Sequence, residues 1–374
     1  MAGLYIHIPF CKSRCVYCGF YSTVNMELRQ RYVDAVCREW LMRRAELTEP
    51  ADTIYIGGGT PSQLNAEQLR QVLAALPPAE AEVTIEVNPD DVTISYAEAL
   101  PPSVNRVSMG AQTFDDGRLR FLHRRHTARQ VREAVGILRR AGIQNISVDL
   151  MYGFPGETLD DWRRDIDAAL ALCPDHLSAY CLMVEEGTAL YEQMRNEKSG
   201  MRNEEWETRN EESSEVERQM YYTLIDRLTA AGYEHYEISN FARPGRRSRH
   251  NSGYWRDVPY IGLGAAAHSY DGRRRSWNVS DIRHYIEAIE RGERPCEEEP
   301  LDDDTHYNDR VTTALRTNDG LDLTTLQDKH RRYCITEARR SLDAGLLSLE
   351  GDTLRLTRQG LFVSDYVMSS LMYV

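Results

Sequence analysis

The chain has 374 residues and a mass of 43.0 kDa, which predicts two or three domains. Hydrophobic residues make up 41% and charged residues 28%, a composition typical of globular proteins that excludes a disordered chain. The net charge is −13, and the acidic segments 185–218 and 293–304 hold most of it. Because the chain has no overall excess of basic residues, which nucleic-acid binding would require, we predict no nucleic-acid partner.

The sequence contains no run of about 18 apolar residues, so it predicts no membrane-spanning helix. Its first residues lack the basic and apolar regions of a secretory signal. We therefore expect a cytoplasmic protein, with attachment of the apolar C-terminal stretch LFVSDYVMSSLMYV to the inner face of a membrane as an open alternative. Cytoplasmic cysteines stay reduced, so the 8 cysteines are candidates for metal ligation, catalysis or packing rather than for disulfides.

Short β-rich runs alternate with amphipathic helical patterns in the first half of the chain. The runs are LYIHI (4–8), TIYIGG (53–58), EVTIEV (82–87), RVSMG (106–110), NISVDL (145–150) and HLSAYCL (176–182). One intervening helix is marked by Val131, Ala134, Val135 and Leu138 at helical spacing, with Gly142 where a C-terminal cap belongs. Successive β-α units predict a parallel sheet, either a Rossmann sheet or a β/α barrel. In both, ligands bind at the carboxyl ends of the strands.

Later segments depart from this pattern. Residues 194–212, MRNEKSGMRNEEWETRNEE, form an imperfect charged repeat, which predicts an exposed insertion without a core of its own. The acidic residues 295–304 are predicted to be a linker. Helical patterns near 310–316 and 336–344, the hairpin LLSLEGDTLRLT and a last helix then predict a winged-helix-like module. Since it lacks a basic face, we favour a packing or interaction role for it.

Cys11, Cys15 and Cys18 form the pattern C-x3-C-x2-C directly after the first predicted strand. Thiolates are soft ligands suited to zinc and to iron–sulfur clusters. Zinc would require a fourth protein ligand, and no second CxxC pair follows. A [4Fe–4S] cluster held by three cysteines keeps one iron open to an exogenous chelator. We therefore predict a [4Fe–4S] cluster, with zinc as the minor alternative.

This triad, within YIHIPFCKSRCVYCGFY, resembles the radical S-adenosylmethionine (SAM) superfamily. Its flanks are similar to one branch, the oxygen-independent coproporphyrinogen III oxidases and their haem-chaperone relatives. The resemblance extends from Tyr5 to about Tyr270, with a weaker match in the C-terminal module. It implies that SAM chelates the open iron. The implied fold is α/β, a partial (β/α)6 barrel with a small C-terminal α+β winged-helix-like module. The implied domains are the barrel core at 1–240 with a charged insertion near 190–215, a haem-motif segment and acidic linker at 241–300, and the C-terminal module at 301–374.

The same resemblance assigns SAM contacts to glycines and polar residues near the strand ends. Glycine lets the backbone approach a ligand and offer N–H donors. A carboxylate can accept from an ammonium group, an arginine can pair with a carboxylate, and an aromatic ring can stack on adenine. Glu86 and Asp149 are expected to end the third and fifth strands. The implied SAM residues are Tyr5, Tyr17, Gly58, Gly59, Thr60, Glu86, Gln112, Arg124 and Asp149.

Two features separate the branches of this family. The oxidases carry a further cysteine two residues after the third ligand, where this chain has Phe20. Residues 250–255, HNSGYW, match the HNxxYW pattern of the haem-chaperone branch. An imidazole at His250 can ligate haem iron, and Tyr254 and Trp255 can pack on the macrocycle. His268, in GLGAAAHSY, is expected to be structural. Arginine clusters at 243–249 and 273–275 either meet an anionic ligand or face solvent.

The resemblance therefore implies a haem chaperone that binds a [4Fe–4S] cluster, SAM and haem. It would deliver haem to haem-requiring proteins, membrane-bound respiratory enzymes among them, and a homodimer is left open. The alternative is an oxygen-independent coproporphyrinogen III oxidase of porphyrin biosynthesis. In that enzyme a radical derived from SAM starts the decarboxylation of propionate side chains. The catalytic residues of that alternative stay unassigned.

Overall fold

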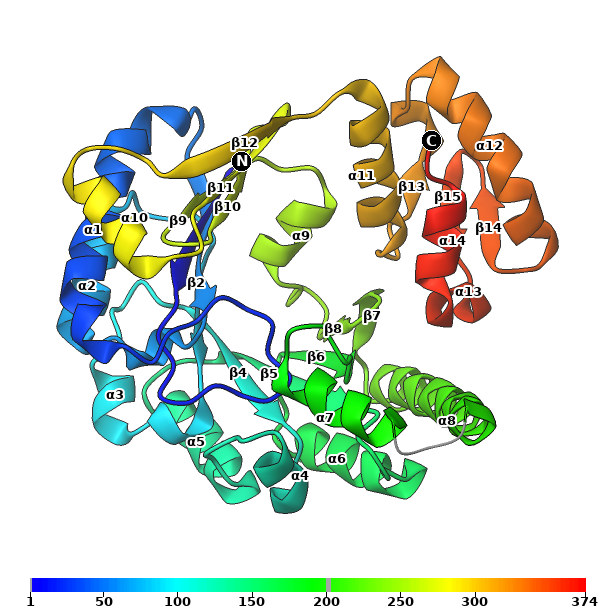
Figure 1. Ribbon diagram of the computed structural model, residues 1–374, viewed down its shortest axis with the longest axis horizontal. Helices are drawn as coiled ribbons and strands as arrows, with labels where there is room; N and C mark the ends of the chain where they lie inside the picture. Colours follow the sequence, from blue (N-terminus) through cyan, green and yellow to red (C-terminus); the bar gives the residue numbers. More distant parts are fainter. Residues whose placement is uncertain (1, 200–202) are drawn as a thin grey trace.

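The computed structural model describes the backbone of residues 2–199 and 203–374 and the side chains of residues 2–195 and 214–374. Its described part contains a twelve-stranded sheet with parallel strands at the centre (Figure 1). These are β1 (Ala2–Ile8), β2 (Ala51–Gly58), β3 (Glu82–Val87), β4 (Arg106–Gln112), β5 (Asn145–Tyr152) and β6 (His176–Cys181). Each coincides with a predicted run. The strand order does not close into a ring, so the α/β partial-barrel prediction is confirmed.

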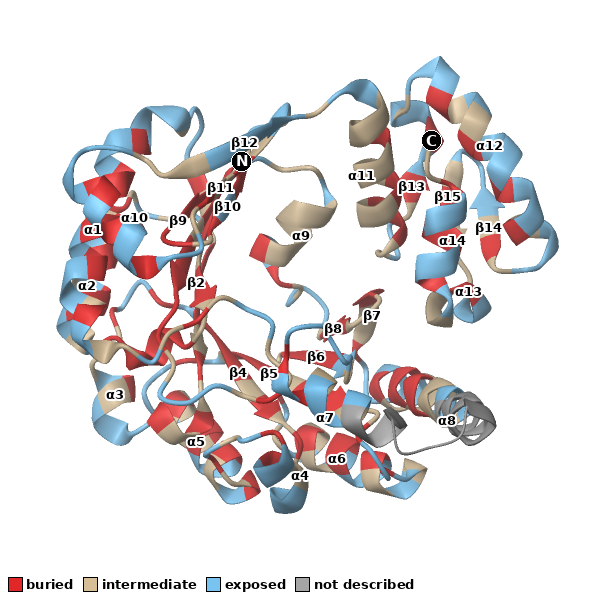
Figure 2. Ribbon diagram, viewed as in Figure 1, coloured by how far each residue is buried: buried red, intermediate tan, exposed pale blue. Residues whose placement is uncertain are grey.

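Helices cover the outer face of these strands (Figure 1). They are α1 (Arg29–Arg43), α2 (Ala66–Ala75), α3 (Ile94–Glu98), α4 (Asp116–Phe121), α5 (Ala128–Arg140) and α6 (Leu159–Ala171). Helix α5 shows why they form: Thr127 and Gln130 make a reciprocal capping box, and the predicted apolar stripe is buried. Gly142 then adopts a φ of 96°, a left-handed conformation that glycine tolerates best. Figure 2 shows the buried residues gathered along the strands and the helix faces that contact them.

Two antiparallel strands extend the sheet beyond β6. Helices α7 (Ala189–Ser199) and α8 (Asn203–Ala230) come first, and β8 (Asn240–Ala242) then pairs with β6 and with β7 (Glu234–Glu237). The second half of α8 packs on the barrel, where Trp162 donates from Nε1 to the carbonyl of Met220 at 3.0 Å. The predicted exposure of residues 194–212 concerns side chains that lie mostly outside the described residues.

The opposite side of the sheet continues from β1 through strands that the sequence did not predict. β9 (Tyr260–Leu263) runs parallel to β1, and β10 (His268–Tyr270), β11 (Arg274–Asn278) and β12 (Cys296–Pro300) follow antiparallel. Helix α10 (Ile282–Glu290) precedes β12. The linker prediction for residues 295–304 is therefore wrong for β12. An edge strand needs backbone bonds on one side only, so exposed glutamates with no apolar alternation can form one.

The C-terminal module has an apolar core of its own, which includes Val311, Leu315, Cys334 and Leu354. Its elements are α11 (Asp303–Leu315), β13 (Leu321–Asp322), α12 (Asp328–Asp343), β14 (Leu347–Glu350), β15 (Thr353–Leu356), α13 (Arg358–Phe362) and α14 (Ser364–Ser370). The strands pair in the order β13-β15-β14, so the predicted small α+β module is present. Short 3-10 turns lie at Met26–Leu28, Arg44–Glu46, Pro61–Gln63, Pro89–Asp91 and Leu323–Thr325. Within the described residues, no helix combines the length and apolar character that crossing a membrane requires.

Candidate cluster, SAM and haem sites

The three cysteines of the predicted cluster lie together in the loop between β1 and α1. Cys11 Sγ lies 3.3 Å from Oγ1 of Thr60, and Arg124 donates from Nη1 to Cys15 Sγ at 3.6 Å. Burial raises the pKa values of the Cys11 and Cys18 thiols, the neighbouring thiols add to this, and the charge of Arg124 opposes it. Cys11 and Cys15 thus each contact a side chain from outside the loop, Thr60 after β2 and Arg124 after α4.

The residues of this loop fit an iron–sulfur cluster by the chemistry of their donors. Three soft thiols come from one loop, and the charge of Arg124 opposes the rise that burial causes in the pKa of Cys11 and Cys18. As the side chains stand, no group of three or more His, Cys, Asp or Glu in the described residues is placed to hold a metal ion. The three cysteines that would bind the cluster are therefore present in one loop, but their thiols do not converge on a single metal position.

The glycines at the end of β2 bring backbone against the cysteine loop. Gly59 donates its N–H to the carbonyl of Ile8 at 2.9 Å, and Gly58 donates to Glu86 Oε2 at 3.1 Å. A Cβ atom on Gly59 would come within 2.7 Å of the Pro9 backbone, and one on Gly58 within 2.6 Å of the His7 ring. Gly58 also has a φ of 112°. Both positions therefore require glycine, as predicted for a close backbone approach.

Two carboxylates lie on the inner face of the barrel, the face opposite the helices. Glu86 is the penultimate residue of β3 and accepts from Tyr55 OH at 2.7 Å, and its burial raises its pKa to about 7. Asp149 accepts from Ser108 Oγ at 3.2 Å, and burial raises its pKa as well. The expectation that Glu86 and Asp149 end their strands needs correction. Asp149 stands three residues before the end of β5, and the register places it next to the level of Gly58, since Val87, Met109 and Val148 are successive partners across β3, β4 and β5.

The remaining predicted SAM residues surround the same edge. Arg124 donates from Nη2 to Asn88 Oδ1 and to the carbonyl of Gly110, both at 2.7 Å. Gln112 ends β4 at a bulge with a φ of 66°. Tyr17 interacts electrostatically with Arg124, and Tyr5, on β1, is hydrogen-bonded to His7 Nδ1 at 2.9 Å. The structure thus brings the cysteine loop, Gly58 to Thr60, Glu86, Gln112, Arg124 and Asp149 to the carboxyl edge, with Tyr5 deeper inside.

The predicted haem motif lies at the other end of the strands. It forms α9 (Arg249–Trp255), which begins at the Ser248 cap, and the backbone N–H groups of Arg249 and His250 donate to Glu82, the first residue of β3. A Cβ atom on Gly3, near the start of β1, would touch the His250 ring. Since β1 rises about 3.3 Å per residue, roughly 17 Å separate Gly3 from the carboxyl edge at Ile8.

His250 is buried, and both of its ring nitrogens have partners. Nδ1 lies 2.8 Å from Oγ1 of Thr53, and Nε2 lies 2.8 Å from the hydroxyl of Tyr254. The ring stacks on Tyr55 at 5.1 Å, and burial lowers its pKa to about 3. Ligation of iron by His250 would therefore break its hydrogen bond to Tyr254 or to Thr53, and the assignment stays a prediction.

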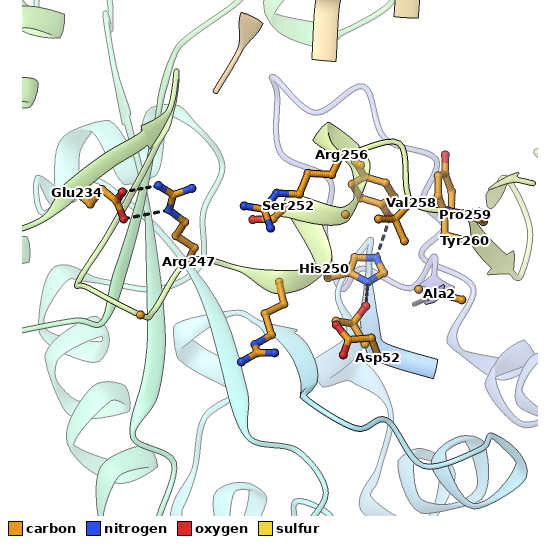
Figure 3. A pocket seen from close by; sticks show the side chains of 16 residues that line it. Ala2, Asp52, Glu234, Arg247, His250, Ser252, Arg256, Val258, Pro259 and Tyr260 are labelled. Carbon is orange, nitrogen blue, oxygen red and sulfur yellow. Dashed lines mark hydrogen bonds and ion pairs between the residues drawn. The ribbon is translucent and has the colours of Figure 1, made fainter. Parts of the chain in front are cut away.

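A cavity of about 390 Å³ lies against α9 (Figure 3). His250, Tyr254 and Tyr260 line it, together with Arg247, which pairs with Glu234. Trp255 is not among the lining residues; its ring lies beneath the guanidinium of Arg316 at 5.2 Å, and its buried Nε1 has no hydrogen-bond partner. The structure thus brings His250 and Tyr254 to one cavity and directs Trp255 toward the C-terminal module.

A continuous band of aromatic rings follows the inner face from this cavity. The rings of Tyr55 and His250, His250 and Tyr254, and Tyr254 and Tyr260 are 5.1, 5.0 and 4.7 Å apart, and Tyr270 follows Tyr260 at 6.3 Å. The sequence analysis missed Tyr55 and Tyr260. Tyr55 pairs directly with Tyr5 on the neighbouring strand, and residues paired in this way point to the same face of a sheet. The pairing of β1 with β2 therefore identifies Tyr55 as a residue of the inner face.

Comparisons with known proteins identify the family of this chain. The family model described as the radical SAM superfamily matches residues 5–169, and the HemN C-terminal domain matches residues 301–363. The chain is 33% identical to the heme chaperone HemW of Bacillus subtilis, over 100% of this chain and 99% of that protein. It is 35% identical to the HemW of Mycobacterium tuberculosis, over 99% and 94% of the two chains. The chain belongs to the radical SAM superfamily, in the HemN-like family that includes HemW.

A solved structure supports the same fold. Coproporphyrinogen III oxidase (HemN) from Escherichia coli, described as a radical SAM enzyme, superposes with a TM-score of 0.81. The superposition covers 99% of this chain and 90% of that one at 21% sequence identity, so it bears on the fold alone. The family to which the chain belongs uses a [4Fe–4S] cluster and SAM. The sheet and the C-terminal module of this chain are those of a HemN-like radical SAM protein.

Proposed function

We propose that this chain is a haem chaperone. It binds a [4Fe–4S] cluster and SAM at the carboxyl edge of the barrel, holds haem on the inner face, and delivers the haem to haem-requiring proteins, membrane-bound respiratory enzymes among them. Full-length relatives named heme chaperone HemW support this role. The observation that carries it is the aromatic band of Tyr55, Tyr254, Tyr260 and Tyr270, because rings along one face suit a flat apolar macrocycle.

At the carboxyl edge, Cys11, Cys15 and Cys18 would hold the cluster, whose open iron, when the cluster is bound, provides the coordination position for SAM. The backbone of Gly58 to Thr60 would contact the methionine part of SAM. Glu86 would accept from its ammonium group and Arg124 would pair with its carboxylate. Asp149 would accept from the ribose hydroxyls, and Tyr5, Tyr17 and Gln112 would complete the walls around the adenosine.

The experiment is an anaerobic titration of the full chain with haem, followed by absorption. We expect saturable binding of one haem per chain, and weaker binding in Tyr260→Ala. Tyr366→Ala is the matched control, because this exposed tyrosine lies on α14, away from the aromatic band. Haem-loaded protein should then transfer its haem to apomyoglobin. Absence of specific binding, or binding without transfer, would contradict a chaperone. In that case, turnover of coproporphyrinogen with SAM and a low-potential reductant would identify the oxidase alternative.

A further inference from the structure

The strands that extend the sheet beyond β1 carry a second set of side chains on the inner face. Ser269 of β10 accepts from Arg43 of α1 at 3.0 Å, and Ser276 of β11 accepts from Arg294 at 2.8 Å, so both serines face the outer side. Side chains alternate along a strand. His268 of β10 and Trp277 of β11, which pair directly, therefore point to the inner face.

His268 has an imidazole that is free to bind a ligand. Its side chain is exposed and stacks on Trp277 at 5.8 Å with 27° between the ring planes. Among the described residues, neither ring nitrogen has a hydrogen-bond partner. Partial desolvation of the ring, with the charge of Arg275 adding to it, lowers the pKa of His268, which favours the neutral form that a metal requires. The sequence predicts a structural role for His268 beside small neighbours, whereas the structure leaves its side chain exposed and stacked on Trp277.

The rings of the other histidines are less free to bind a metal. His250, His176 and His7 have partners on both ring nitrogens, and His126, His235, His306 and His330 each have a partner on one. The side chains of His123 and His284 are exposed and their rings have no hydrogen-bond partner within the described residues, but no ring contact orients them either. His268 combines an exposed ring with an aromatic neighbour that fixes its orientation.

The surroundings of His268 suit an anionic macrocycle. Tyr260 and Tyr270 lie on the same face and continue the aromatic band from the α9 cavity. Arg275, also on this face, pairs with Asp309 of α11 and acts electrostatically on His268. An arginine at the rim of an apolar face is the donor that a propionate carboxylate requires. His268 lies against Gly262, the register partner of Tyr5, whereas His250 of α9 lies against Gly3, so His268 is nearer the carboxyl edge than α9 is.

We propose that His268 is the axial protein ligand of the haem iron, with Trp277 orienting its imidazole and Arg275 receiving a propionate. This rests on the proposed function, because it names the iron ligand of the same haem site. In this arrangement His250 is a positioning residue. It joins Thr53 of β2 to Tyr254 of α9 and so fixes one end of the aromatic band. Haem binding at His268 requires no hydrogen bond of the ring to break.

The test compares the absorption and electron paramagnetic resonance spectra of haem-loaded full chain with those of His268→Ala, His250→Gln and His284→Ala. We expect His268→Ala to lose the histidine-ligated spectrum and to bind haem about tenfold more weakly or worse. Added imidazole should restore the spectrum. His250→Gln, which keeps hydrogen-bonding groups on its side chain, and the exposed control His284→Ala should keep the wild-type spectrum.

The outcomes separate the two proposals. Wild-type protein that binds no haem overturns the proposed function. Wild-type protein that binds haem, with an unchanged spectrum in His268→Ala, overturns the ligand assignment alone. If both His268→Ala and His250→Gln lose the spectrum, recovery with imidazole in His268→Ala supports the assignment, and failure to recover overturns it.

Discussion

The buried carboxyl group of Glu86 makes the stability of this protein depend on pH. It accepts from Tyr55 OH and from the N–H of Gly58, and no cation lies within ion-pair distance of it in the described residues. Glu86→Gln removes the titrating group and keeps both contacts. The amide oxygen can accept from Gly58, while the Tyr55 hydroxyl turns to accept from the amide nitrogen.

The size of the effect follows from the pKa. Burial raises the pKa of Glu86 from 4.5 to about 7 in the folded protein. The folded state therefore holds this proton more tightly than the unfolded state, so stability is greatest below the unfolded pKa and falls as the pH rises through 7. At 1.36 kcal/mol for each pKa unit, the wild type loses about 3 kcal/mol across this window. Glu86→Gln has no such loss.

The assay is urea unfolding of wild type and Glu86→Gln at about pH 5 and about pH 8. We expect the free energy of unfolding of the wild type to fall by about 2.5 kcal/mol more than that of the variant between the two conditions, because a small part of the loss has already occurred at pH 5. Glu98→Gln, which changes an exposed glutamate of α3, should follow the wild type. Equal pH dependence in wild type and Glu86→Gln would refute the reasoning, because it would mean that Glu86 is not buried as an acid.

Three further predictions concern the cluster, SAM and the C-terminal module. Cys15→Ala should abolish the absorption of the reconstituted cluster, and a full iron and sulfide content would contradict the cysteine assignment. Asp149→Asn should weaken SAM binding in equilibrium dialysis at unchanged iron content, and an unchanged Kd would remove Asp149 from the SAM site. Arg316→Gln leaves the buried Glu237 without its 2.8 Å ion pair and should lower the free energy of unfolding by about 3 kcal/mol. Arg358→Gln, which breaks an exposed pair, should cost less than about 1 kcal/mol, and equal losses would contradict the difference in burial.

The sequence by itself determined the barrel strands and the outline of the carboxyl edge. Parallel central strands are covered on both sides, so β1 appears as a short, nearly continuous apolar run that a sequence pattern detects. The cysteine spacing and the glycines at the end of β2 are also local features. Three ligands from one loop, or consecutive glycines at the end of a strand, can be recognised from residues that are neighbours in the chain. Helix α5 is local as well, with its capping box and its terminal glycine.

Only the tertiary structure decided the extension of the sheet and the roles of the histidines. β12 is held by backbone hydrogen bonds to β11. Its exposed glutamates show no apolar alternation, so the sequence does not predict a strand there. His250 stands in a motif that suggests an iron ligand, yet Thr53, nearly two hundred residues earlier, occupies one of its nitrogens. His268 stands among small residues that suggest packing, yet strand alternation directs it to the inner face. Burial and hydrogen-bond partners come from residues distant in sequence, so composition and spacing do not specify them.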